Sequence, residues 1–210
     1  MMQNFGLGPE DIKAQLDKLA ETDSNVKAAI ELVDYPGERV NPQGLNTFVR
    51  VIMGQQLSVK AAASIWARVQ ALVGEDADAS AYAAQSDEAL REAGVSRQKI
   101  KYLRSLCETI ESGVLDIAAL PHMDDEEAIK AITSVKGLGV WSAHMYLMFS
   151  LGRTDIWPVG DLAVRVGIGR IVGLEERPTE KEAEKLGERW KPYRSVMALL
   201  SWHYYSNAPF

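Results

Sequence analysis

The sequence predicts an all-α protein, and three observations lead to this prediction. Apolar residues recur at helical spacing, usually with a capping residue before the run and Gly or Pro after it. No segment combines alternating apolar and polar residues with flanking turn pairs, as a strand would. Finally, 47% hydrophobic and 25% charged residues in a chain of 210 are typical of a globular protein with a large core.

The helices follow from these start and stop signals in order. Pro9 suits a first helical turn, and Asp23 or Ser24 can cap the second helix. Ser58 and Ser96 are further candidate caps, and Gly113 closes the longest helix. The expected helices cover residues 9–20, 24–33, 45–54, 59–73, 79–84, 86–93, 97–111, 124–134, 140–151, 162–172, 179–190 and 192–206.

Composition argues against several classes of protein. No apolar run approaches membrane-spanning length and the N-terminus lacks a secretion pattern, so we expect a cytoplasmic protein that does not enter a membrane. Cys107 is the single cysteine, which excludes both an intrachain disulfide and the four-Cys ligand set of an iron–sulfur cluster. The three histidines lack metal-ligand spacing, and no nucleotide-binding glycine motif is present, so we expect no catalytic metal and no organic cofactor.

The charge pattern is ambiguous with respect to nucleic acid. A net charge of −6 argues mildly against it, since phosphates favour Lys and Arg. However, Arg97, Lys99, Lys101 and Arg104 lie in a segment without acidic residues, and three of them, Arg97, Lys101 and Arg104, share one helical face. This basic face predicts a DNA contact, and the alternative is an ordinary solvated helix face.

The stretch from Thr133 to Ala143 predicts a sharp turn between two helices. Gly137 and Gly139 flank Leu138, and Gly reverses the chain at little steric cost. The backbone N–H groups at the start of the next helix form an anion site, and the neighbouring Lys136 favours a phosphate of a nucleic-acid backbone. A plain connection between helices is the alternative.

The order of motifs resembles a known family. The glycine turn is followed by an apolar helix, a loop with Pro158 and then Asp161 at a helix start, as in the helix-hairpin-helix DNA glycosylases. The segments 52–66 and 190–195, together with Trp202, resemble the alkylpurine branch, the 3-methyladenine DNA glycosylase II family. The resemblance covers roughly residues 40 to 205.

The resemblance implies two helical lobes with a DNA cleft between them. Longer bacterial members of the family add an N-terminal β domain, and we expect none here because this sequence has neither the residues nor the pattern for it. The expected lobes are residues 40–130, and 1–39 together with 131–210. The glycine turn is expected on one rim of the cleft and Asp161 at its bottom.

The resemblance also assigns a catalytic residue and a base pocket. Asp161 is the expected catalytic carboxylate, with an ordinary helix cap as the alternative and Asp155 as a fallback acid. Trp141 and Trp202 fall on the pocket positions, where an electron-rich ring can hold a cationic purine, although both could be core residues. Met145, beside Tyr146, stands where the best-known bacterial member of the family has a pocket Tyr, so we expect Met145 and Tyr146 to bind the substrate as well.

Residues that contact DNA are implied in the same way. Gln56 holds the wedge position that fills the gap left by an everted base, and Leu57 can share this task. Together with the residues of the basic helix face and of the glycine turn, the expected DNA-binding residues are Gln56, Leu57, Ser58, Arg97, Lys101, Lys136, Gly137, Leu138 and Gly139. The carbonyls of Thr133, Val135 and Gly137 match positions that hold a monovalent cation, Na⁺ or K⁺, in the family.

Trp141 indicates the type of reaction. Bifunctional members of the superfamily carry a Lys nucleophile at this position, which Trp cannot replace, and Lys136 is a poor substitute. We therefore expect a monofunctional enzyme that leaves an abasic site. The resemblance implies hydrolysis of the N-glycosidic bond of 3-methyladenine and 7-methylguanine type lesions in duplex DNA, and we expect a monomer. The alternatives are activity on hypoxanthine or ethenoadenine, a non-catalytic DNA-binding module, and a helical scaffold that binds no nucleic acid.

Overall fold

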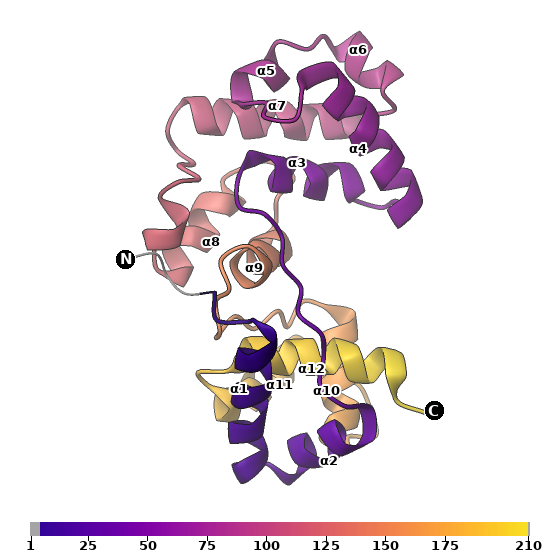
Figure 1. Ribbon diagram of the computed structural model, residues 1–210, viewed down its shortest axis with the longest axis vertical. Coiled ribbons are helices and arrows are strands. Elements are labelled where there is room, and N and C mark those ends of the chain that lie inside the picture. Colours follow the sequence, from indigo (N-terminus) through magenta and orange to yellow (C-terminus); the bar gives the residue numbers. More distant parts are fainter. Residues whose placement is uncertain (1–4, 210) are drawn as a thin grey trace. The chain divides into compact units, whose positions relative to one another are not determined.

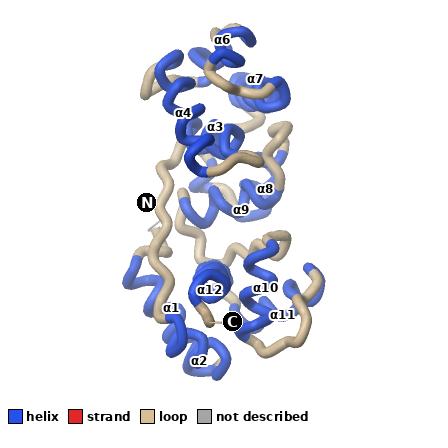
Figure 2. The backbone as a smooth tube through the Cα atoms, turned by 90° about the vertical axis from the view of Figure 1, so that its right-hand side faces the viewer, coloured by secondary structure: helices blue, strands red, loops and turns tan. Residues whose placement is uncertain are grey.

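The computed structural model describes residues 5–209, and the regular structure in this range is entirely helical (Figure 2). This confirms the all-α prediction. None of the helices within this range is long and apolar enough to cross a lipid bilayer. The chain divides into two compact units, Met1–Val40 with His144–Phe210, and Asn41–Ala143.

The unit of residues 41–143 combines the two 15-residue helices α4 (Val59–Val73) and α7 (Arg97–Glu111) with several shorter ones. The shorter elements are α3 (Leu45–Gly54), α5 (Ala79–Ala83), α6 (Asp87–Glu92), the 3₁₀ turn η1 (Leu120–His122), α8 (Asp125–Thr133) and the first residues of α9 (Val140–Phe149). Ser58 and Ser96 cap α4 and α7 as the sequence predicts. Fully buried Phe48, Ile52 and Leu103 lie in the core of this unit, where α3 packs against α7.

The glycine hairpin, residues 133–139, belongs to this unit. The second boundary between the units therefore falls after Ala143, later than the expected position near residue 130. The reason is that α7 and the end of α3 hold the hairpin: the backbone N–H of Lys136 donates to Ser105 Oγ at 3.0 Å, and Gln55 Nε2 donates to the Gly137 carbonyl at 2.8 Å.

The second unit is built around the C-terminal helix. It contains α1 (Pro9–Thr22), α2 (Ser24–Val33), the remainder of α9, α10 (Leu162–Ile171), α11 (Glu180–Gly187), the 3₁₀ turn η2 (Glu188–Trp190) and α12 (Arg194–Asn207). Every residue from Ser195 to Trp202 in α12 is buried, so this part of the helix is covered on all sides, whereas its last turn is exposed. Figure 1 shows α1, α2 and α10 grouped around α12, so the first two helices of the chain pack against the last one.

Most expected helix ends lie within two residues of the observed ends, and the two helices near the C-terminus differ most. The segment 179–190 is the α-helix α11 followed by the separate 3₁₀ turn η2, and the last helix begins at Arg194 rather than at residue 192. Tyr193, which precedes it, has φ −118° and ψ 29°, outside the helical range.

The crossing of α10 and α12 depends on a single glycine. A Cβ atom at Gly167 would collide with the backbone carbonyl of Ser201, so only glycine allows the two helices to approach this closely. Asp161 caps the start of α10, and Trp202 follows Ser201 directly on α12. The close crossing therefore fixes the positions of Asp161 and Trp202 relative to each other.

We predict that Gly167→Ala lowers the free energy of unfolding by about 1–3 kcal/mol, because the added methyl group overpacks a backbone contact. Urea denaturation measures this change. Gly37→Ala is the matched control, since a Cβ at Gly37 meets no atom within 4 Å. Equal denaturation midpoints for the two variants would contradict the proposed role of Gly167.

Candidate active site

Asp161 is held in a fixed orientation at the beginning of α10. Its Oδ1 accepts hydrogen bonds from the backbone N–H groups of Ala163 at 2.9 Å and Val164 at 3.1 Å. Its own N–H donates to the Pro158 carbonyl at 2.9 Å, which turns the chain into the helix. Asp161 is thus an N-cap, and its side chain remains partly exposed. Capping is compatible with a catalytic role, because it fixes the direction of the carboxylate.

Trp202 completes the support of this carboxylate. Its indole Nε1–H donates to Asp161 Oδ1 at 3.1 Å. The ring lies 5.9 Å from that of Phe149 at an interplanar angle of 44°, and only 9% of the residue is exposed. Trp202 therefore has two roles in this arrangement: most of its surface is core, and its polar edge orients Asp161.

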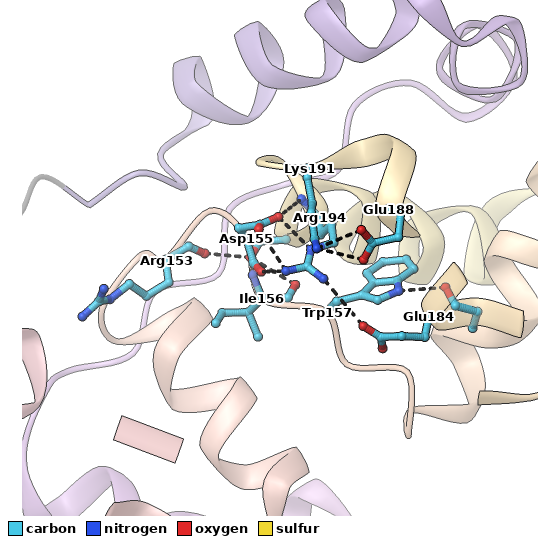
Figure 3. Close-up of polar contacts among 10 residues, drawn as sticks. Arg153, Asp155, Ile156, Trp157, Glu184, Glu188, Lys191 and Arg194 are labelled. Atoms are coloured by element: carbon cyan, nitrogen blue, oxygen red, sulfur yellow. Dashed lines mark hydrogen bonds and ion pairs between the residues drawn. The ribbon is translucent and has the colours of Figure 1, made fainter. Parts of the chain in front are cut away.

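The loop that leads to Asp161 is tied to α12 and α11. Ser195 Oγ donates to the Arg153 carbonyl at 2.7 Å and accepts from the Ile156 N–H at 2.9 Å. Trp157 Nε1 donates to the Ala183 carbonyl at 2.9 Å. Figure 3 shows this loop beside the residues that hold it. The segment before Pro158 is consequently anchored at several points.

Asp155 belongs to this anchor. Both of its carboxylate oxygens bind one guanidinium: Arg194 Nε lies 2.8 Å from Oδ1 and Nη2 lies 2.9 Å from Oδ2 (Figure 3). Glu184 lies 3.7 Å from the same arginine. Asp155 is therefore engaged as a structural ion pair and is a poor candidate for the fallback acid. Because Arg194 is mostly buried and paired with Asp155, it is a poor candidate for a contact to a DNA backbone.

Met145 and Tyr146 occupy positions in the core. Their exposed fractions are 9% and 3%, and they lie on α9 among buried neighbours. Trp141, at the beginning of the same helix, differs because 49% of it is exposed. The alternative that Trp141 is a core residue is therefore wrong.

Trp141 lines a cavity within the unit of residues 41–143. The cavity has a volume of about 520 Å³, and its lining residues are Arg50, Val51, Gly54, Gln55, Gln56 and Trp141. An aromatic ring, two amides and a guanidinium suit a flat polar ligand such as a nucleotide.

The wedge segment, residues 56–59, begins at one side of this cavity, where Gln56 lines it. Gln56 adopts a φ of 56°, which is unusual for a residue other than glycine, and its side chain is exposed. Leu57 and Val59 are exposed to 41% and 87%. Backbone strain combined with exposed apolar side chains is common at functional sites, since neither feature favours folding. Ser58 caps α4 between them, with its side chain bonded to the Ala61 N–H.

The glycine hairpin is rigid on its inner side. Position 137 requires glycine for two reasons. Its φ of 96° is unfavourable for other residues, and a Cβ there would collide with the Tyr102 ring. Leu138 as a whole is only 4% exposed, so it packs into the fold and is a poor candidate for a direct DNA contact. Lys136 and Gly139 are exposed, as a phosphate contact requires.

The three carbonyls expected to bind a cation are of a suitable chemical type. The Val135 carbonyl accepts the Leu138 N–H at 3.0 Å, and the Gly137 carbonyl accepts Gln55 Nε2. A carbonyl oxygen has a second lone pair, so these bonds leave acceptor capacity at Val135 and Gly137, and the Thr133 carbonyl is the third candidate ligand for a weakly bound monovalent ion.

The expected basic face of α7 is only partly realised. Arg104 turns inward and donates to the carbonyls of Tyr82 at 3.1 Å and Ala83 at 2.9 Å, where it satisfies the end of α5. Arg104 is therefore a structural residue, and the prediction that it shares the DNA-binding face is wrong. Lys99 donates to the Met53 carbonyl at 2.7 Å, and burial lowers the pKa of its ammonium group.

Arg97 and Lys101 remain exposed, but their surroundings are mixed in charge. The depression beside them is also lined by Asp87, Glu88, Arg91 and Glu92. Any attraction for phosphate at this surface is therefore weaker than the sequence spacing alone suggests.

Sequence reasoning did not identify three polar residues next to these sites. Gln55 ties the wedge to the hairpin, Arg50 lines the cavity of Trp141, and the Arg39 guanidinium lies 5.2 Å from the centre of the Trp202 ring. Each of these residues meets a residue that is far away in the sequence, so no local pattern predicts the contact. Only the pair of glutamines after Gly54 indicated that this segment could be functional.

Comparisons with known proteins agree with this architecture. Residues 49–192 match the HhH-GPD superfamily of base excision DNA repair proteins. The DNA-3-methyladenine glycosylase 1 of Schizosaccharomyces pombe is 30% identical over 203 residues, covering 92% of this chain and 89% of the relative. The chain spans only 57% of the length of a Bacillus subtilis relative that is 29% identical to it.

Two solved structures resemble the chain closely. A DNA-3-methyladenine glycosidase from Bacillus halodurans has a TM-score of 0.81 at 36% identity, covering 91% of this chain and 88% of that one. The S. pombe 3-methyladenine DNA glycosylase in complex with abasic DNA has a TM-score of 0.75 at 29% identity, covering 90% and 95%. The chain belongs to the HhH-GPD superfamily of base excision DNA repair proteins.

We predict that Asp155→Asn lowers the free energy of unfolding by about 1–3 kcal/mol, because it leaves the mostly buried Arg194 guanidinium with only the more distant Glu184 as a charge partner. Glu188→Gln is the control, since its exposed pair with Lys191 is expected to contribute less than about 1 kcal/mol. Urea denaturation of both variants measures the difference. Equal losses would show that the Asp155 pair does not anchor the loop.

Proposed function

We propose that the protein is a monofunctional DNA glycosylase that releases alkylated purines, of the 3-methyladenine and 7-methylguanine type, from duplex DNA. The observation that carries the proposal is the Asp161 carboxylate, which two backbone N–H groups and the Trp202 indole hold in one orientation after the Pro158 loop. The names of the S. pombe and B. halodurans proteins support this activity and this substrate class.

Asp161 acts on the developing positive charge of the sugar. Breaking an N-glycosidic bond moves electrons toward the base and leaves an oxocarbenium-like sugar, which a fixed anion stabilises without any cost of reorientation. The same carboxylate orients or deprotonates the attacking water. The products are the free base and an abasic site, and these steps need only the carboxylate and a water molecule.

Aromatic rings hold the base. An alkylated purine is often cationic, and a cation over an indole face gains about 0.5–2 kcal/mol. Trp202 lies directly beside Asp161, and Trp141 is half exposed at its cavity. Because position 141 carries no amine, the enzyme leaves the DNA backbone uncut. Lys136, whose N–H is tied to Ser105 at the hairpin, serves as a phosphate contact.

The hairpin and wedge hold the DNA. Lys136 and the hairpin backbone bind a phosphate without reading sequence, while Gln56, assisted by Leu57, fills the space of the everted base. Arg97 and Lys101 add a weaker outer contact, and a monovalent cation on the hairpin carbonyls would strengthen the phosphate contact. The complex of the S. pombe relative with abasic DNA supports duplex DNA as the partner. The protein acts as a monomer, and its cytoplasmic location remains a prediction from sequence.

We predict that Asp161→Asn reduces the single-turnover rate of base release from methylated duplex by about 100-fold or more, because a fixed anion is lost. Asn is as good an N-cap as Asp, so α10 should remain intact, which circular dichroism can verify. Asp124→Asn, at the equivalent cap of α8, is the control and should retain the rate. If Asp161→Asn released base as fast as the unchanged protein, the proposed mechanism would be wrong. DNA binding without release by the unchanged protein would instead identify a non-catalytic module.

We predict opposite effects of Gln56→Gly on stability and activity. Glycine relieves the strain of a φ of 56°, so the denaturation midpoint should stay the same or rise. Base release should fall, and it should fall less when the lesion is mispaired, since a mispaired base costs less to extract. Single-turnover rates on paired and mispaired duplexes measure this difference. Equal losses on both duplexes would argue against a wedge role.

A further inference from the structure

We propose that Lys99 is a positioning residue for the wedge: its ammonium group holds the end of α3 and thereby fixes the Gln56 side chain in one place. The role is indirect, because Lys99 acts on base release only through Gln56. This inference rests on the proposed function and adds a residue on which the wedge depends.

Gln56 lies in a turn that other residues have to hold. The turn begins where α3 ends: Gln55 has φ −54° and ψ 128°, and Gln56 has φ 56°. The Leu57 N–H donates to the Gly54 carbonyl at 3.2 Å. These are the features of a type II turn, in which glycine or asparagine usually holds the position of Gln56. Because a positive φ at glutamine costs free energy, the turn relaxes unless contacts on both sides fix it.

Lys99 supplies the contact on the α3 side of the turn. Its Nζ donates to the Met53 carbonyl at 2.7 Å, across 46 residues of sequence. This carbonyl belongs to the last turn of α3, where carbonyls lack helical N–H partners. Burial of the ammonium group in this contact lowers the pKa of Lys99. The ammonium group therefore fixes the chain three residues before Gln56.

The contact on the other side of the turn leads back to the same helix. Gln55 Nε2 donates to the Gly137 carbonyl of the hairpin at 2.8 Å. The hairpin is held on α7 by the bond from the Lys136 N–H to Ser105 Oγ at 3.0 Å. Lys99 and Ser105 both belong to α7, so the contacts form a closed circuit through α3, the hairpin and α7. Removing Lys99 opens this circuit at the wedge and leaves the hairpin held.

Arg104 provides a matched comparison on the same helix. It also donates to carbonyls at a helix end, those of Tyr82 and Ala83 in α5, but α5 leads to no proposed DNA contact. Loss of either cation should lower stability, since each leaves helix-end carbonyls without a donor. Only the loss of Lys99 should release the wedge.

The first test measures the single-turnover rate of base release from methylated duplex. Lys99→Met removes the donor and keeps a long apolar side chain. We expect the rate to fall about 3- to 10-fold, because the wedge is no longer fixed in its productive position. An unchanged rate in Lys99→Met would overturn the proposal.

Two further variants separate positioning from general stability. Lys99→Arg keeps a cationic donor and should restore most of the rate. Arg104→Met should retain the rate although its denaturation midpoint falls. If Arg104→Met lost as much activity as Lys99→Met, the loss would follow from lowered stability and the proposal would be wrong.

A double variant shows whether Lys99 acts through Gln56. Adding Lys99→Met to Gln56→Gly should change the rate by less than about 2-fold, since the side chain that Lys99 positions is already absent. Independent contributions would multiply instead. Multiplied losses would show that Lys99 acts elsewhere, for example on a phosphate, and would overturn the proposal.

A measurement without DNA separates failure of this proposal from failure of the proposed function. Amide hydrogen exchange of Met53 reports opening of the last turn of α3, and that of fully buried Leu103 in α7 reports global unfolding. We expect the ratio of the Met53 rate to the Leu103 rate to rise about 3- to 10-fold in Lys99→Met and to stay unchanged in Arg104→Met. An unchanged ratio in Lys99→Met would overturn the positioning role. If the unchanged protein released no base, the proposed function would fail, and the exchange ratio would still decide whether Lys99 fixes the turn.

Discussion

The hydrogen bond from the Trp202 indole to Asp161 joins the two helices on which the candidate active site depends. Its 3.1 Å length requires α10 and α12 to cross closely, and Gly167 permits this because any side chain there would strike the Ser201 carbonyl. The loop before α10 is fixed by Ser195 and by the Asp155 pair with Arg194. Packing, loop anchoring and capping therefore converge on one carboxylate, as preorganised electrostatic catalysis requires.

The unit of residues 41–143 has a different balance between stability and function. Its buried core is regular, but its surface keeps a strained Gln56, an 87% exposed Val59 and a half-exposed Trp141. These features oppose folding, since strain and exposed apolar area both raise the free energy of the folded state. The bond from Gln55 to the Gly137 carbonyl ties this segment to the hairpin, so the proposed wedge and the phosphate site form one rigid region.

Local charge is more informative here than total charge. The net charge is −6, yet Arg39, Arg50 and Lys136 are exposed beside the proposed base and DNA contacts. On α7 the opposite holds, because the two exposed cations share their surface with carboxylates, and Arg104 is used to hold α5. Modest local attraction suits the proposed activity, because such an enzyme has to leave one DNA site and search for another.

The sequence by itself determined the helical class, most helix bounds and the residues that cap them, because periodicity and capping are local properties of the chain. It also placed Asp161 at a helix start, and the order of motifs identified the family. It did not predict that Arg104 turns inward, that Gln55 reaches a carbonyl 82 residues away, or that Arg39 lies over Trp202. Long side chains have many rotamers of similar energy, so tertiary packing decided which charges, rings and carbonyls they meet.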